Sequence, residues 1–240
     1  MTTTSASSSA SASGSASGSA SGSASASTEA QLAATARAYD HWAGPYTELV
    51  RTEFDRLPLD RAMFAAFADT VRAGSGTAVA ELGCGPGRLT AHLRDLGLEP
   101  FGVDLSPVMI DIARQAYPGL RFEVGSMHAL DLPDASLDGV VSWYSLIHAL
   151  PADVPGYVAE FARILAPGGH LLLGFFESEG GPVTPFDHRV TTAYRWPVDE
   201  LARIAAVHGF AETGRMLREP REGERFRRGH LLLRKEGRRD

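Results

Sequence analysis

A glycine-rich segment that follows an apolar run is the most distinctive candidate site in the chain. Residues 80–90 read AELGCGPGRLT, which places Gly83, Gly85 and Gly87 close together. Glycines at this spacing leave the backbone uncovered, so a nucleotide or a nucleotide-like cofactor can approach it closely. The segment therefore predicts a ligand-binding loop, although a tight turn without a ligand has the same local pattern.

Two residues beside these glycines indicate which kind of ligand the loop suits. The dinucleotide-binding fingerprint needs a glycine three residues after Gly85, and this chain has Arg88 there. Glu81 would repel a pyrophosphate, whereas the same carboxylate would attract a ligand that carries an ammonium group. The pattern favours a cationic, phosphate-free adenosine cofactor. An NAD-dependent oxidoreductase on a related fold is the less favoured alternative.

The apolar pattern around the loop predicts the elements that position it. Apolar runs predict strands at 78–82, 99–105, 121–125, 137–146 and 170–176. Helical spacing predicts helices at 88–96, 106–115, 154–165 and 197–208. Two last strands, at 211–218 and 229–235, are joined too closely for a crossover helix and should be antiparallel. The predicted fold class is α/β: a Rossmann-like, doubly wound, mostly parallel seven-stranded sheet with an antiparallel last strand, helices on both faces and extra N-terminal helices.

Three motifs on this framework resemble those of class I S-adenosylmethionine-dependent methyltransferases. ELGCGPG is similar to the first motif of that family, GVDLS to the second, and ILAPGGHLLL to the segment leading into the fifth strand. The resemblance covers roughly residues 39–235. It implies S-adenosylmethionine as the cofactor, with S-adenosylhomocysteine as the product. This cofactor carries an ammonium group and a sulfonium but no phosphate, in agreement with Glu81.

The resemblance also assigns cofactor contacts to particular residues. Asp104, which ends the second strand, would accept hydrogen bonds from both ribose hydroxyls. Taken alone, Asp104 could equally cap a helix, and Met127 could be a core residue. The complete expected cofactor-binding set is Tyr39, Tyr46, Glu81, Gly83, Gly85, Gly87, Asp104, Leu105, Met109, Ser126, Met127, His128 and Ser142.

The segment before the first strand is expected to contain a tail and a helical lid. Residues 1–28 are almost entirely Ser, Ala, Gly and Thr, which predicts a disordered tail. Thr28 and Gln31 resemble a capping box that would start a helix, and residues 44–46 would interrupt it. The methyltransferase domain is therefore expected over residues 29–240, with a lid over about 29–74. Tyr39 and Tyr46 resemble a lid pair over the cofactor; an aromatic stripe packed on the core is the alternative for Tyr39.

Methyl transfer mainly requires alignment of the acceptor with the methyl group, and a base only where the acceptor must lose a proton. His148 is the titratable group best matched to neutral pH, so we expect it to act as a base or to orient the acceptor. The alternative is that His148 packs or caps its loop. The expected substrate-binding residues are Tyr144, His148, His188, Arg189 and Tyr194. Oxygen is favoured as the acceptor atom over nitrogen or carbon, and no metal site is expected.

Composition narrows the class of partner. The chain has 240 residues and a formal net charge of −6, which argues against a general nucleic-acid-binding protein. The single cysteine, Cys84, fits a reducing compartment, and no apolar run approaches the roughly 20 residues that span a bilayer. We expect a cytoplasmic enzyme with a small-molecule substrate and no nucleic-acid or membrane partner. A non-catalytic protein that binds S-adenosylmethionine for regulation is the alternative, and the oligomeric state is left open.

Overall fold

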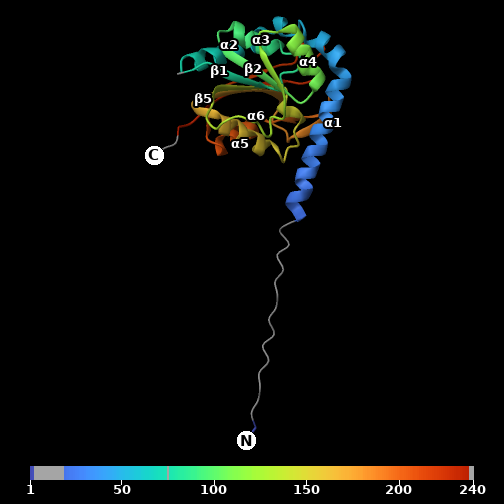
Figure 1. Ribbon diagram of the computed structural model, residues 1–240, viewed down its shortest axis with the longest axis vertical. Coiled ribbons are helices and arrows are strands. Elements are labelled where there is room, and N and C mark those ends of the chain that lie inside the picture. Colours follow the sequence, from blue (N-terminus) through green and yellow to red (C-terminus); the bar gives the residue numbers. More distant parts are fainter. Residues whose placement is uncertain (3–18, 75, 238–240) are drawn as a thin grey trace.

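The computed structural model describes residues 1–2, 19–74 and 76–237, and its centre is a single β-sheet (Figure 1). Five strands lie parallel in the order β3-β2-β1-β4-β5. Their bounds are β1 Ala78–Leu82, β2 Glu99–Asp104, β3 Arg121–Val124, β4 Leu137–Trp143 and β5 Leu165–Glu177. The order reverses between β1 and β4, so the carboxyl ends of these two strands flank the crevice where such sheets bind ligands.

The last two strands complete the sheet beside β5. β9, Arg228–Lys235, pairs antiparallel with β5, and β8, Phe210–Arg218, pairs antiparallel with β9. The predicted antiparallel pair is confirmed, and the path β3-β2-β1-β4-β5-β9-β8 is the expected seven-stranded, mostly parallel arrangement. The α/β, Rossmann-like fold class is therefore confirmed.

A hairpin that the sequence analysis did not predict extends one end of the sheet. It consists of β6, Thr184–Asp187, and β7, Thr192–Trp196. β5 runs beyond the end of β4, whose last paired residue, Trp143, lies opposite Gly174. This overhang leaves the edge at Phe176 free to pair with β7. Of the nine strands found in the described residues, β7 therefore owes its place beside β5 to the length of β5, and β6 joins the sheet through β7.

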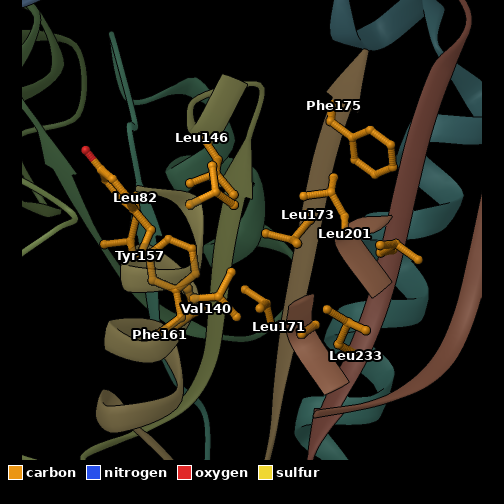
Figure 2. Packing of buried hydrophobic residues seen from close by; sticks show 14 of the residues in the cluster. Leu82, Val140, Leu146, Tyr157, Phe161, Leu171, Leu173, Phe175, Leu201 and Leu233 are labelled. Carbon is orange, nitrogen blue, oxygen red and sulfur yellow. The ribbon is translucent and has the colours of Figure 1, made fainter. Parts of the chain in front are cut away.

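Helices cover both faces of the sheet, as predicted. On one face, α5, Val154–Ile164, and α6, Val198–Val207, pack against apolar side chains of the central strands. Figure 2 shows Tyr157 and Phe161 of α5 beside Val140 and Leu171. On the other face, α2, Pro58–Arg72, and α3, Arg88–Asp95, contribute to a second cluster that includes Phe64. α4, Pro107–Ala116, is capped by Ser106, whose side chain accepts a hydrogen bond from the Met109 amide at 3.0 Å.

The helix α1, Ser19–Val50, differs from the sequence-based expectation in both its start and its length. It begins upstream of Thr28 and continues through Gly44 and Pro45, so the predicted capping box and the predicted break are both wrong. Tertiary contacts explain this: the Thr28 hydroxyl donates to Asp153 Oδ2 at 2.8 Å, and Asp40 Oδ1 accepts from the Ser106 hydroxyl at 2.6 Å. α1 consequently lies along α4 (Figure 1).

The predicted tail, residues 1–28, is described only in part. Residues 3–18 lie outside the described residues, whereas residues 19–28 form the first part of α1. None of the helices in the described ranges has the length and apolar character that a membrane crossing requires.

Candidate functional site

The glycine loop lies at the carboxyl end of β1, in a tightly folded conformation. Gly83, Gly85 and Gly87 have φ angles of 80°, 50° and 81°, in the left-handed region that favours glycine. The amides of Gly83 and Cys84 both donate to the Val103 carbonyl, at 2.7 and 3.1 Å. A Cβ atom on Gly83 would lie 2.2 Å from Ser145 Cβ. Glycine is required at this position because the backbone conformation and the lack of space both exclude a side chain.

Asp104, at the end of β2, links the glycine loop to the start of α4. Its Oδ2 accepts a hydrogen bond from the Gly85 amide at 2.8 Å, and its Oδ1 accepts one from the Ser106 amide at 2.9 Å. Burial raises the pKa of Asp104, and the hydrogen bonds from Ser106 and Gly85 oppose that rise. A carboxylate has about four acceptor sites. Asp104 therefore keeps acceptor capacity for a ligand while the loop holds it in place.

Glu81, on β1, is buried below the loop, with only 2% of its surface exposed. The Thr90 hydroxyl donates a hydrogen bond to its carboxylate. Burial raises the pKa of Glu81 from its ordinary value of 4.5 to about 8. A cation bound beside Glu81 would favour the ionised carboxylate.

The raised pKa of Glu81 predicts a pH dependence of stability. Between pH 4.5 and 8 the folded chain holds a proton on Glu81 that the unfolded chain releases. The free energy of unfolding therefore falls as the pH rises through this window, by up to about 1.4 kcal/mol per pH unit from this group. Glu81→Gln stays neutral and should remove this contribution, as measured by denaturant unfolding at several pH values.

The difference between Glu81→Gln and the wild type isolates Glu81 from the other titrating groups. The exposed residue Glu99 offers a matched control, because Glu99→Gln changes the same charge at the surface. If Glu81→Gln and the wild type lose stability equally between pH 4.5 and 8, the carboxyl does not hold its proton in the folded state.

Two cavities meet at the glycine loop. The smaller one, of about 70 Å³, is lined by Asp104 and by side chains of α1. The larger one, of about 320 Å³, is lined by Glu81 and by aromatic and arginine side chains. The residues that line both cavities are Tyr46, Gly83, Gly85, Trp143 and Tyr144. A ligand in the smaller cavity and one in the larger cavity would therefore meet beside the loop and the end of β4.

The structure brings many of the expected cofactor residues to the smaller cavity. They are Tyr39, Tyr46, Gly83, Gly85, Asp104, Leu105 and Met127. The other expected contacts do not line it. Gly87 adjoins Phe122, Met109 and Ser142 are fully buried, and His128 contacts the ring of Tyr157. The Ser126 backbone forms a bridge with Ala129, and Glu81 lines the larger cavity. The assignment of every residue of the expected set to the cofactor stays a prediction.

His148 lies in the short helix Leu146–His148 and lines the smaller cavity. Its Nδ1 is 3.0 Å from the Thr192 carbonyl oxygen, which can only accept, so Nδ1 carries the proton. Nε2 therefore accepts a hydrogen bond from the Tyr39 hydroxyl, at 2.9 Å. Burial lowers the pKa of His148, which favours the neutral ring. In this arrangement His148 joins α1 to β7, and a catalytic role for it stays a prediction.

Of the expected acceptor-binding residues, three line the larger cavity: Tyr144, His188 and Arg189. Tyr194 packs against the main core instead, and His188 contacts His148 with ring centroids 5.3 Å apart. Tyr144 has a φ of 52°, which is unusual for a side chain of this size. Its hydroxyl lies 3.0 Å from His230 Nε2, and His230 stacks on Trp143.

Sequence reasoning missed several charged residues of the larger cavity. They are Asp60, Arg218, Glu224 and Arg228, which come from α2 and from the region of β8 and β9. One signal was available for Asp60. It shares a helical face with Phe64, Phe67 and Val71, and a carboxylate in such an apolar stripe needs a partner.

Comparisons with known proteins give matches to methyltransferases. A family model described as a methyltransferase domain matches residues 79–169, which run from β1 into β5. A malonyl-[acyl-carrier protein] O-methyltransferase of Serratia marcescens is 33% identical over 97 residues, covering 40% of this chain and 37% of that protein. An O-methyltransferase of Penicillium expansum is 31% identical over 147 residues, covering 56% and 52%. The chain thus spans about half or less of the length of these curated relatives.

A solved structure gives the same fold over a longer stretch. It is the 1,6-didemethyltoxoflavin-N1-methyltransferase of Burkholderia thailandensis, with bound 1,6-didemethyltoxoflavin and S-adenosylhomocysteine. Its TM-score is 0.60 at 24% identity, with 80% of this chain and 87% of that chain covered. These matches confirm the resemblance that the three sequence motifs indicated.

Proposed function

We propose that this chain, whose residues 79–169 carry the methyltransferase domain on the fold of the class I S-adenosylmethionine-dependent enzymes, transfers a methyl group from S-adenosylmethionine to a small molecule. The observation that carries the proposal is the junction of the two cavities. The smaller cavity holds the carboxylate of Asp104, and the larger one holds aromatic and charged side chains. A methyl donor and a methyl acceptor would meet between them, beside Gly83.

The residues of the smaller cavity fit the cofactor chemically. Asp104 has acceptor capacity for the two ribose hydroxyls, and no lysine or arginine lines this cavity among the described residues. Met127, which lines this cavity, would adjoin the adenine, and Glu81, which lines the larger cavity beside the glycine loop, would favour the cationic end of the cofactor where the two cavities meet. When bound, S-adenosylmethionine supplies a methyl group that its sulfonium already activates. The chain then has to exclude water and to align the acceptor.

Entry of the cofactor requires α1 to move. The smaller cavity has a volume of about 70 Å³, well below the roughly 300–1,000 Å³ of small-molecule sites. Tyr39 and Tyr46 line it from α1, and their rings pack edge to face with centroids 5.4 Å apart. We infer that these two tyrosines form a lid that opens for the cofactor and closes over it.

The acceptor is proposed to be a small molecule that presents an oxygen, with nitrogen or carbon less favoured. Support for oxygen comes from the two curated relatives, both named as O-methyltransferases. The Burkholderia structure is that of an N1-methyltransferase, so the fold itself accommodates nitrogen as well.

The proposal is tested by calorimetry with S-adenosylhomocysteine, followed by incubation of the protein with methyl-labelled S-adenosylmethionine and extract of its producing cells. We expect cofactor binding and a labelled small molecule. Binding without a labelled product would indicate a regulatory protein, and a labelled protein or RNA would contradict the small-molecule assignment. Absence of cofactor binding, with binding of a nicotinamide dinucleotide instead, would favour an oxidoreductase. His148→Asn with full turnover would remove His148 from the mechanism.

A further inference from the structure

A row of four side chains with alternating charge lines the larger cavity. Arg218 Nε lies 3.1 Å from Asp60 Oδ2, and the two terminal nitrogens of Arg218 lie 2.7 and 2.9 Å from the Glu224 carboxylate. Arg228 Nη2 follows at 3.7 Å from Glu224 Oε1. Asp60 and Arg218 have side chains that are only 1% and 7% exposed. The order of charges is therefore Asp60, Arg218, Glu224 and Arg228, with each inner residue held from both sides.

The first and last residues of this row, Asp60 and Arg228, each have a polar atom without a hydrogen-bond partner among the described residues. Asp60 Oδ1 and Arg228 Nε are buried and have no hydrogen-bond partner among the described residues. Asp60 Oδ1 is 3.6 Å from His230 Nε2, which is beyond hydrogen-bond range, and Tyr144 already bonds to that nitrogen. Buried polar atoms are normally paired, and both residues line the larger cavity. A ligand that donates to Asp60 and accepts from Arg228 would satisfy both.

The walls between these ends are aromatic. The Arg228 guanidinium lies 4.3 Å from the ring centre of Phe176 and 5.0 Å from that of Tyr144. Phe186 and Phe226 pack against each other with ring centres 4.9 Å apart, and Phe186 also packs on Phe176. All of these rings line the larger cavity. Such walls suit a flat, apolar ring.

Positive charge prevails at the Arg228 end. Arg189 and Arg225 also line the cavity, and within the described ranges neither forms an ion pair with a carboxylate. Arg225 donates to the Asp187 carbonyl instead, at 2.9 Å. The pKa of His188 is lowered to about 4 by burial and by the positive charge of neighbouring residues, including Arg228 and Arg189. An anionic group on the ligand would be stabilised at this end.

We propose that the methyl acceptor is an aromatic compound that carries a hydroxyl or N–H group and an anionic oxygen group, with the donor bound by Asp60 Oδ1 and the anion by Arg228. This inference rests on the proposed function, because it assigns the larger cavity to the acceptor. In this proposal Asp60 accepts a hydrogen bond from the ligand and Arg228 binds its anionic group. The two roles are tested separately.

The first test uses the wild-type protein saturated with S-adenosylhomocysteine. Ligand-detected NMR would measure dissociation constants for the three hydroxybenzoates, for their methoxy analogues, for benzoate and for phenol. At least one hydroxybenzoate is expected to bind about tenfold more tightly than its methoxy analogue, benzoate and phenol, since hydrogen bonds to charged groups have this strength. If no hydroxybenzoate binds better than these three comparisons, the proposal is wrong.

The second test measures the contributions of Asp60 and Arg228 to ligand binding separately. Asp60→Asn retains an oxygen for Arg218 but turns an amide toward the ligand, so the preference for hydroxyl over methoxy should disappear. The wild type should also bind hydroxybenzoate more tightly than the neutral hydroxybenzamide, and Arg228→Gln should abolish this second preference. Arg203→Gln is the matched control, because Arg203 lies on α6, outside the larger cavity, and its ion pair among the described residues is with Glu200. If both preferences persist in these variants, the two residues do not bind the ligand.

Controls keep this proposal separate from the proposed function. Each variant is checked for thermal unfolding and for affinity for S-adenosylhomocysteine, which should change less than twofold. If Asp60→Asn does not fold, the wild-type comparison of hydroxy and methoxy ligands decides the question. Failure of every protein to bind S-adenosylhomocysteine would overturn the proposed function, whereas normal binding without aromatic-acid preference would overturn only the acceptor class.

Discussion

Asp104→Ala is expected to weaken binding of S-adenosylhomocysteine by at least about 100-fold, because it removes a carboxylate that would hold both ribose hydroxyls. Hydrogen bonds to charged groups contribute about 1.5–3 kcal/mol each, and two of them correspond to this loss of affinity. The substitution also removes the acceptor of the Gly85 and Ser106 amides. The glycine loop would thus lose its link to α4 together with its ligand. Calorimetry with S-adenosylhomocysteine measures the effect directly.

Substitution of a second, exposed acidic residue is the control for the loss of a negative charge. Asp111 lies on α4, and its side chain is 69% exposed. Asp111→Ala should leave the affinity for S-adenosylhomocysteine unchanged. Asp104→Asn, which retains one oxygen acceptor, should lose less affinity than Asp104→Ala. An affinity of Asp104→Ala within twofold of the wild type would show that the ribose binds elsewhere.

The elements around Asp104 could be predicted because their signals are local. Each strand of the parallel sheet is a short apolar run, and each helix between them has its own periodicity. The glycine loop and Asp104 follow the ends of two such strands, so their meeting at one edge of the sheet follows from the topology. A single sequence therefore sufficed to predict that the glycine loop and Asp104 lie at one edge of the sheet.

α1 could not be predicted in the same way, because distant contacts determine its extent. Residues 44–46 have the local pattern of a helix break, since proline removes a backbone hydrogen bond. The helix nevertheless continues, and Asp40, Tyr39 and Thr28 bind groups on three other parts of the fold. These partners are more than 60 residues away in sequence. Tertiary contacts outweighed a local penalty of a few kcal/mol.

Most charged residues of the larger cavity could not be predicted from the sequence, for a related reason. Asp60 and Arg218 are separated by 158 residues, and only the packing of α2 beside the final strands brings them together. The interleaved arginines and glutamates of residues 215–228 have the pattern of a solvated connection, yet Arg218 is buried and Arg228 lies within an aromatic cavity. Charge patterning cannot distinguish these two environments, because both contain interleaved arginine and glutamate.

The second large effect is expected for Gly83→Ala, which should lower stability and abolish tight cofactor binding. An alanine at a φ of 80° is strained, and its Cβ would lie 2.2 Å from Ser145 Cβ. Ser145 cannot easily retreat, because its hydroxyl donates to the Leu82 carbonyl at 2.6 Å and lies 2.8 Å from the Ser142 hydroxyl. Strain and overpacking together predict a loss of about 2–5 kcal/mol in the free energy of unfolding.

Substitutions of other glycines isolate the clash from the backbone strain. Gly85→Ala has strained backbone but only an ordinary contact, 3.9 Å from Tyr46 Cε1, so it should lose less stability than Gly83→Ala. Gly44→Ala, in an open position on α1, should raise stability by up to about 1 kcal/mol. The double variant with Gly83→Ala and Ser145→Gly removes the clashing Cβ and should lose less than the sum of the two single variants. Strictly additive losses in denaturant unfolding would mean that Gly83 and Ser145 do not pack together. The loop would then lack the support from the segment after β4 that positions it between the two cavities.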